Sequence, residues 1–328
     1  MARSYSIVFM GTPDFSVPCL EALHRSRHRV IQVVTQPDRP QGRGRRVSPP
    51  PVKTAALKLG LPVIQPQKIK ATEFIDTLTR LSPDLMVVIA YGRILPKALL
   101  DIPAAGCINV HASLLPLYRG AAPIHWAIIN GETKTGITTM LMDEGMDTGD
   151  ILLTATEPIT PEDTAATLHD RLAVLGAKVL EDTLERLADG RLTPQPQPHA
   201  GATLAPILKK EDGRLDWRQP AERIYDRIRG LTPWPGAFTF YDRKRLKIFK
   251  AAARPADGPT AAPGTIVPGF PDELRVATGN GLISLLEVQG ESGNRLTAEE
   301  YLRGHPIPAG TRFDDSLESS APFPPSHP

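Results

Sequence analysis

Short runs of apolar, largely β-branched residues alternate with amphipathic stretches through the first half of the chain. The runs at residues 5–11, 30–36 and 84–92 are nearly continuous, which is typical of strands that are buried on both faces. Amphipathic stretches at 15–25 and 72–81 lie between them and predict helices. This βαβα order indicates an α/β fold with a Rossmann-like, doubly wound parallel sheet and right-handed crossovers.

A further strand is expected at residues 107–111, and it ends in two polar side chains. Asn109 and His111 are two residues apart on this strand, so they point to the same face. In open α/β sheets the ligand crevice lies beyond the carboxyl ends of the strands. We therefore expect both side chains to face a ligand.

The pattern changes after a predicted helix at 162–188. Residues 191–206 contain four prolines and almost no apolar periodicity, which predicts an extended linker. The sequence thus predicts a catalytic domain over residues 1–190, a linker over 191–206 and a second domain over 207–313.

The second domain is expected to be mostly β-structure. One helix is predicted at 221–230. Short strand candidates separated by Gly and Pro turns follow at 237–241, 246–252, 264–267, 273–278 and 282–288. This pattern predicts a small OB-like β-barrel. The last residues, 314–328, are acidic and rich in Ser and Pro, and we expect them to be disordered.

Bulk properties narrow the class of protein. The chain has 328 residues, 41% of them apolar, and no apolar run approaches the roughly 20 residues that cross a bilayer. The N-terminal residues carry no export-type cleavage site, so we expect a cytoplasmic protein without a membrane partner. Cys19 and Cys107 fit neither a disulfide framework nor a zinc site, and both are expected to be buried.

Positive charge is localised rather than general. Net charge is only +2, but residues 209–254 hold 13 Lys or Arg against 6 Asp or Glu. One basic cluster, "RKRLKIFK", covers residues 243–250, and another, "QPDRPQGRGRR", covers residues 36–46. Such clusters indicate a polyanionic partner, although either one alone is also compatible with an ordinary solvated surface.

The first strand leads into "FMGTPDFS", which raises the question of a bound dinucleotide. The stretch has a single glycine where a G-x-G-x-x-G fingerprint needs three, and P-loop spacing is absent. We therefore expect a Rossmann-like sheet without its usual cofactor.

A third polar group lies in the loop "MDEGMDTGDIL", which contains Asp143 and Asp147. Alone, this loop is compatible with a simple turn, and one histidine at a strand end is compatible with a packed residue. An amide, an imidazole and a carboxylate that meet at one crevice can perform acyl-group chemistry, because they supply an oxyanion donor and a proton relay.

Six stretches resemble the methionyl-tRNA formyltransferase family in order and spacing, from Gly11 to about Phe313. They are "GTPDFSVPCL", "TQPDRPQGRGRR", "VVIAYGRILP", "INVHASLLPLYRGAAPIHWAI", "GITTMLMDEGMDTGDIL" and "WPGA". The Asn-x-His-x-Ser-Leu-Leu-Pro motif with its downstream Asp is shared by the wider group of enzymes that use 10-formyltetrahydrofolate. It therefore identifies the cosubstrate and not the acceptor. The basic segment that begins at residue 36 and the basic C-terminal domain resemble the tRNA-specific members.

The resemblance implies roles for particular residues. Asn109 and His111 would stabilise a tetrahedral oxyanion, and Asp147 would pair with His111 and assist proton movement, without a metal. The residues that would contact the folate are Ser113, Leu114, Leu115 and Pro116. The residues that would bind the acceptor arm of initiator methionyl-tRNA are Arg39, Arg43, Arg45, Arg46, Arg243, Lys244, Arg245 and Lys247. The aromatic residues Trp234 and Phe249 are expected in the core, and the chain is expected to act as a monomer.

Two other functions share some of these features. A formyltransferase acting on a small amine, such as a nucleotide sugar, would use the same site without a basic barrel. A non-enzymatic RNA-binding protein on an inactive scaffold would not need Asn109, His111 and Asp147 together. The tail after Phe313 is longer and more acidic than the family resemblance leads us to expect, and no role is assigned to it.

Overall fold

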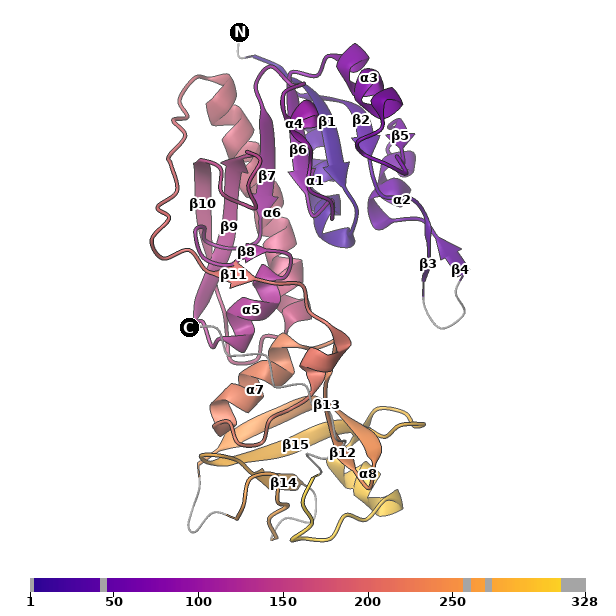
Figure 1. Cartoon of the computed structure of the whole chain (residues 1–328), viewed down its shortest axis with the longest axis vertical. Coiled ribbons are helices and arrows are strands. Elements are labelled where there is room, and N and C mark those ends of the chain that lie inside the picture. The colour runs from indigo at the N-terminus through magenta and orange to yellow at the C-terminus, as the bar shows by residue number, and fades with distance from the viewer. Residues whose placement is uncertain (1–2, 42–45, 256–260, 269–272, 314–328) are drawn as a thin grey trace. The chain divides into compact units, whose positions relative to one another are not determined.

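The computed structural model describes residues 3–41, 46–255, 261–268 and 273–313 (Figure 1). The chain forms two compact units. The first comprises residues 1–123, 134–158 and 168–206, and the second comprises residues 124–133, 159–167 and 207–328. The predicted linker, 191–206, thus lies within the first unit, and the change of unit at Pro206 coincides with its predicted end.

The first unit is built on a seven-stranded sheet with the order β10-β9-β7-β6-β1-β2-β5 (Figure 1). Its strands are β1 (Ser6–Gly11), β2 (Arg29–Val34), β5 (Val63–Ile64), β6 (Leu85–Ile89), β7 (Cys107–His111), β9 (Lys134–Leu141) and β10 (Ile151–Pro158). The pairs from β5 through β7 are parallel, as predicted. The pairs β7–β9 and β9–β10 are antiparallel, which the sequence analysis did not predict. The carboxyl end of β7 therefore lies beside a hairpin rather than beside another crossover.

Helices cover both faces of this sheet. They are η1 (Asp14–Ser16), α1 (Val17–Arg25), α2 (Pro51–Lys58), α3 (Thr72–Leu81), α4 (Lys97–Leu100) and α6 (Ala165–Ala188), which enters the first unit at Leu168. Gly176 of α6 packs close to Val110 and Ile137 of the sheet and to Cys19 of α1. The opposite face packs against α3 and α4 in a second apolar cluster. The predicted doubly wound arrangement is confirmed.

The residues of β7 that face α4 change from apolar to polar along the strand. Cys107 belongs to the apolar cluster on that face and is only 2% exposed. The next two residues of the same parity are Asn109 and His111, because side chains on a strand alternate with a period of two. The polar pair thus begins where the apolar packing of this face ends.

The predicted linker is extended but closely packed. Backbone bonds of 2.8 Å in both directions join Gln195 to Ile151 of β10. Further on, β11 (Leu204–Ala205) runs parallel to β8 (Arg119–Gly120). Because both of its ends are hydrogen-bonded to the first unit, this segment has a fixed path across it.

The second unit is centred on an antiparallel sheet with the order β12-β13-β15-β14, and β16 pairs with β15. Its elements are α5 (Pro123–Ile129), η2 (Lys210–Gly213), α7 (Ala221–Gly230), β12 (Ala237–Tyr241), β13 (Lys244–Arg254), β14 (Leu274–Ala277), β15 (Leu282–Gln289), β16 (Leu296–Thr297) and α8 (Ala298–Gly304). The predicted strand at 264–267 forms only isolated bridges. Trp217, Ile228 and Phe313 are members of the core of this unit.

Helix α8 was not predicted from the sequence. It begins at a capping box in which Thr297 Oγ1 accepts the Glu300 N–H at 3.2 Å and Glu300 accepts the Thr297 N–H at 2.9 Å. These bonds satisfy backbone donors that a short helix otherwise leaves unpaired. The second unit thus has the antiparallel strands expected of the predicted OB-like β-barrel, with this helix in addition.

A buried histidine makes the stability of the first unit depend on pH. His28 is 6% exposed, and its Nδ1 accepts the backbone N–H of Tyr5 at 3.1 Å. Burial, and then the nearby Arg27, lower the pKa of His28 against a smaller opposing effect of Glu185. A histidine whose folded-state pKa is lowered stabilises the protein fully above its unfolded pKa of about 6.5, and this contribution is lost as the pH falls below that value.

We predict that His28→Asn, which keeps an acceptor for the Tyr5 N–H, removes this pH dependence. The difference in free energy of unfolding between the unmodified protein and the variant should shrink between pH 7.5 and pH 5, as measured by urea denaturation. The same substitution at the exposed His24 serves as the control. A difference that stays constant over this pH range would contradict the prediction.

Candidate active site

The candidate site begins at the carboxyl end of β7. Asn109 and His111 are 9% and 6% exposed, and both come from a strand held on each side. β6 pairs with it in parallel, with Val88 opposite Asn109, and β9 pairs with it in antiparallel fashion, with Thr138 opposite His111. This double pairing fixes the backbone from which the two polar side chains project.

His111 has a defined tautomer and orientation. Its Nε2 lies 2.9 Å from the carbonyl oxygen of Tyr118. Since a carbonyl can only accept, Nε2 carries a hydrogen and donates it. The other ring nitrogen, Nδ1, faces Oδ2 of Asp147 at 3.7 Å. The imidazole is therefore held from one side and presents Nδ1 to a carboxylate on the other.

Asp147 brings the site together. Its Oδ2 accepts the backbone N–H of Gly120 at 2.8 Å, and its Oδ1 accepts from Asn109 Nδ2 at 3.3 Å. Its side chain is only 16% exposed. The carboxylate that the sequence analysis placed near His111 thus contacts Asn109 as well, and the structure brings all three predicted side chains to one place.

The loop between β9 and β10 determines where Asp147 lies. The backbone of Asp147 has φ +55°, in the left-handed region that few residues other than glycine adopt. A Cβ atom on Gly149 would lie 1.7 Å from the carbonyl oxygen of Leu141, so only glycine fits there. The other acid of the loop, Asp143, accepts from the Gly145 N–H and the Thr148 hydroxyl. Asp143 therefore shapes the turn, and Asp147 faces the site.

The segment after β7 is folded tightly against the sheet. Ser113 is fully buried, and its hydroxyl donates to the Leu117 carbonyl at 2.6 Å. Leu115 is also buried, and its N–H donates to Thr138 Oγ1 at 3.1 Å. Leu114 and Pro116 are partly exposed. Of the four residues predicted to contact the folate, the side chains of Leu114 and Pro116 are the accessible ones.

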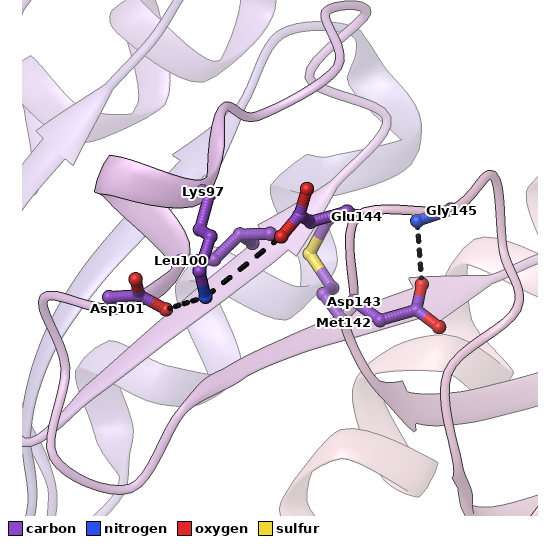
Figure 2. Close-up of a pocket in the computed structure, with 7 residues that line it drawn as sticks. All are labelled: Lys97, Leu100, Asp101, Met142, Asp143, Glu144 and Gly145. Carbon is purple, nitrogen blue, oxygen red and sulfur yellow. Dashed lines mark hydrogen bonds and ion pairs between the residues drawn. The ribbon is translucent and has the colours of Figure 1, made fainter.

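A cavity of about 450 Å³ borders the loop that carries Asp147 (Figure 2). Its lining residues are Lys97, Leu100, Asp101, Met142, Asp143, Glu144 and Gly145. Lys97 Nζ lies 3.0 Å from Asp101 and 3.9 Å from Glu144, so it links α4 to the loop. Leu100 and Met142 pack against the apolar cluster that contains Cys107. The cavity therefore joins an apolar wall to a polar rim.

Two described parts of the first basic cluster, residues 39–41 and residue 46, belong to an antiparallel ribbon formed by β3 (Arg39–Gln41) and β4 (Arg46–Ser48). Arg39 is exposed. Arg43 and Arg45 lie outside the described residues, and for Arg46 the structure describes the backbone only.

Residues next to this ribbon form a charged contact. Lys53 Nζ lies 2.8 Å from Asp38, and Gln65 donates to the same carboxylate at 2.7 Å. Hydrogen bonds from Lys53 and then Gln65 lower the pKa of Asp38. Lys53 is therefore engaged in an ion pair at the base of the ribbon.

The second basic cluster lies on β13 and on the turn that precedes it. Arg243, Lys244, Arg245 and Lys247 are all exposed, and Leu246 between them points into the core. The guanidinium of Arg245 lies 4.1 Å from the ring centroid of Phe238, a cation–π contact that orients this side chain. The cluster is thus an exposed, partly ordered set of cations.

The expectation for two aromatic residues needs correction. Trp234 is 50% exposed, so the prediction that it belongs to the core is wrong. It lies between two prolines in the turn after α7. Phe249 is partly buried beneath the guanidinium of Arg295, at 4.6 Å, and is not a member of the core cluster.

Clusters of metal ligands and membrane-spanning helices are both absent from the described part of the chain. Within it, no group of three or more His, Cys, Asp or Glu is arranged to hold a metal ion. None of its helices has the length and apolar character needed to cross a membrane.

Contacts that the sequence analysis missed come from the main chain. The Tyr118 carbonyl and the Gly120 N–H hold His111 and Asp147, and both lie in the "YRG" stretch just after the Ser-Leu-Leu-Pro motif. Gly120 has φ +123°, and a Cβ there would lie 2.8 Å from the Ala205 carbonyl. A glycine so close to the motif is the one signal in the sequence that indicated a close backbone approach.

Comparison with known protein families agrees with this geometry. The family model described as "Formyl transferase" matches residues 5–184, and "Formyl transferase, C-terminal domain" matches residues 207–306. The fold and the matched domains are those of formyl transferases.

Curated relatives identify the particular family within the formyl transferases. The methionyl-tRNA formyltransferase of Citrifermentans bemidjiense is 52% identical over 304 residues, which cover 93% of this chain and 95% of that protein. The methionyl-tRNA formyltransferase of Caldanaerobacter subterraneus subsp. tengcongensis is 54% identical over 306 residues, covering 93% and 98%. The chain belongs to the methionyl-tRNA formyltransferase family, as its motifs predict.

Solved structures share the fold at low sequence identity. HypX from Aquifex aeolicus in complex with tetrahydrofolic acid has a TM-score of 0.61 and 18% identity, covering 92% of this chain and 47% of that one. An N-formyltransferase from Helicobacter canadensis in complex with folinic acid and dTDP-3-aminofucose has a TM-score of 0.63 and 17% identity, covering 87% and 99%. At these identities the likeness establishes the fold.

Proposed function

We propose that this protein transfers the formyl group of 10-formyltetrahydrofolate to the α-amino group of methionine on initiator methionyl-tRNA. The product is N-formylmethionyl-tRNA, which serves translation initiation in the cytoplasm. The observation that carries the proposal is the Asp147 carboxylate, which contacts Asn109 and faces His111, in a chain about half identical to methionyl-tRNA formyltransferases. The family uses folate-derived formyl donors, and the particular donor and acceptor are part of the proposal.

The three side chains have the chemistry that the transfer requires. The donor supplies a formyl carbon that the neutral amine attacks, and an unperturbed α-amine has a pKa of about 7.7 to 8.0, so this form is accessible. Attack places negative charge on the formyl oxygen. Asn109 Nδ2 has two hydrogens, one of which goes to Asp147, and the other is available to stabilise that charge, together with His111 Nδ1 once that atom has taken up a proton.

Proton movement is assigned to His111 and Asp147. The α-nitrogen must lose a proton as its bond to carbon forms, and N10 of the folate must gain one as its bond to carbon breaks. Nδ1 of His111 and Oδ2 of Asp147, 3.7 Å apart, are the atoms that take up and return this proton. The Tyr118 carbonyl and the Gly120 N–H hold the two groups in place during the exchange.

The cavity beside the loop is the proposed site of the folate ring system. Leu100 and Met142 offer an apolar wall for a flat ring, and Lys97 and Asp101 at the rim offer polar groups for its edge. Leu114 and Pro116, with the backbone of the Ser-Leu-Leu-Pro segment, are proposed to contact the donor nearer to the reacting carbon.

We predict that Asp147→Asn lowers kcat by about 10² to 10⁴-fold, the usual contribution of a group that takes up or delivers a proton in the reaction. His111→Ala should have an effect of similar size. Formylation of methionyl-tRNA is measured with radiolabelled donor, and tRNA binding is measured separately by filter retention. Asp76→Asn, at an exposed carboxylate on α3, is the control. Near-normal turnover in both site variants would refute these roles.

Filling the cavity should weaken donor binding. We predict that Leu100→Trp raises the Kd for 5-formyltetrahydrofolate, a stable donor analogue, by about tenfold or more, equivalent to about 1.4 kcal/mol. Calorimetric titration measures this, and tRNA affinity should not change. Leu57→Trp, at a leucine of α2 that is 60% exposed, is the matched control. Unchanged donor affinity in Leu100→Trp would place the ring system elsewhere.

Salt dependence tests the nature of the acceptor. If Arg39 and the second basic cluster bind tRNA phosphates, affinity should fall steeply between 50 mM and 200 mM salt. Lys244→Gln should reduce the slope of log K against log salt by about one, and Arg80→Gln on α3 should leave it unchanged. A flat salt profile with turnover on a sugar amine would instead support the small-amine acceptor. Absence of turnover with any acceptor would support the RNA-binding protein without activity.

A further inference from the structure

Gln197 lies in the proline-rich segment 191–206 and is only 6% exposed. Its Nε2 donates to two carbonyl oxygens of the loop between β9 and β10, that of Asp147 at 2.9 Å and that of Gly149 at 2.6 Å. Its Oε1 accepts from the Arg119 guanidinium, at 2.7 Å from Nη2 and 3.2 Å from Nε. Both hydrogens and the oxygen of this amide are therefore used.

Only one of the two orientations of the Gln197 amide group is favourable. If the Gln197 amide were reversed, its oxygen would face two carbonyl oxygens and its NH₂ group would face a guanidinium, so four attractive contacts would become repulsive. Arg119 is 7% exposed and is itself held on β8 by the pairing with β11. Gln197 thus links β8 to the loop between β9 and β10 and fixes the position of this loop relative to β8.

Asp147 needs such support because of its backbone. A φ of +55° lies in the left-handed region, which residues with a side chain seldom adopt, and the conformation persists only where the surroundings impose it. One of the two carbonyls that Gln197 binds belongs to Asp147 itself, and the other belongs to Gly149, two residues later. The next residue of β8, Gly120, donates its N–H to the Asp147 carboxylate. One short strand therefore fixes the backbone of Asp147 through Arg119 and Gln197, and its side chain directly.

We infer that Gln197 is a positioning residue, which with Arg119 holds the Asp147 carboxylate in register with Asn109 and His111. This inference rests on the proposed function, in which Asp147 takes part in the transfer. The proline-rich segment then has a role in the reaction beyond connecting two units, because it carries the amide that orients the loop.

The substitution Gln197→Glu distinguishes a role of this side chain in positioning the loop from a role in filling space. The substituted side chain has the same size and still accepts from Arg119, but a second oxygen replaces the NH₂ group that the two loop carbonyls need. We expect kcat to fall on the order of 10- to 100-fold, because small displacements of a reacting group have effects of this size. KM for both substrates should change little. Gln195→Glu, at an exposed glutamine two residues earlier, is the matched control and should have unmodified kinetics.

A second readout does not depend on activity. The amide proton of Gly120 bonds to a carboxylate, so its NMR resonance reports the position of Asp147. Protein labelled with ¹⁵N-glycine and ¹³C-carbonyl arginine selects glycine amides that follow arginine, and this set includes Gly120. We expect the Gly120 resonance to shift upfield in Gln197→Glu and to stay in place in Gln195→Glu.

The outcomes are distinguishable. A lower kcat together with a shifted Gly120 amide supports the inference. An unchanged Gly120 amide overturns it whatever the kinetics, as does a wild-type kcat in a protein whose Asp147→Asn variant is inactive. If Asp147→Asn retains turnover, the proposed function of that residue fails, and the Gly120 amide still decides whether Gln197 positions it. If Gln197→Glu does not fold, Gln197→Met, which removes the donors without adding charge, is subject to the same criteria.

Discussion

The site depends on the placement of one carboxylate. Asp147 lies where β7 ends, and its two oxygens are held by the Gly120 N–H and the Asn109 amide, with the His111 ring opposite. A carboxylate that accepts two hydrogen bonds from fixed donors keeps its position without needing a full positive charge beside it. The rest of the first unit provides the sheet edge and the loop that make this placement possible.

The proposed chemistry places two demands on the fold. A donor site and a proton relay must share one loop, and the loop from Met142 to Asp150 borders the cavity at its start and carries Asp147 farther along. Acceptor binding requires cations that are not used internally. Arg39 and the exposed residues of β13 are candidates, whereas Lys53 is engaged with Asp38.

Much of this was predictable from the sequence, for identifiable reasons. Buried parallel strands are continuous apolar runs, so β1, β2, β6 and β7 were found, and Asn109 and His111 stood out because polar residues interrupt such a run. The antiparallel direction of β9 and β10 was not found, since polar threonines and Gly136 weaken the apolar pattern in β9. Helix α8 was missed because it has only 7 residues, and so short a helix is stabilised by tertiary packing rather than by local propensity.

Gln197 illustrates what sequence patterns do not contain. Proline-rich composition indicates an extended chain, and the chain is extended, but composition does not say that its two ends pair with β10 and β8. The burial of Gln197 follows from that pairing alone. Side chains whose role is created by contacts between distant segments leave no local signature.

The antiparallel arrangement of β9 and β10 has an evolutionary consequence. The register of this hairpin is set by pairing along both strands, from Lys134 opposite Pro158 to Met140 opposite Ile151. The connecting loop can therefore gain or lose residues without shifting the strands. A change in loop length would displace the Asp147 carboxylate from the Asn109 amide and the Gly120 N–H, so the site limits the length of this loop during evolution although the strands do not.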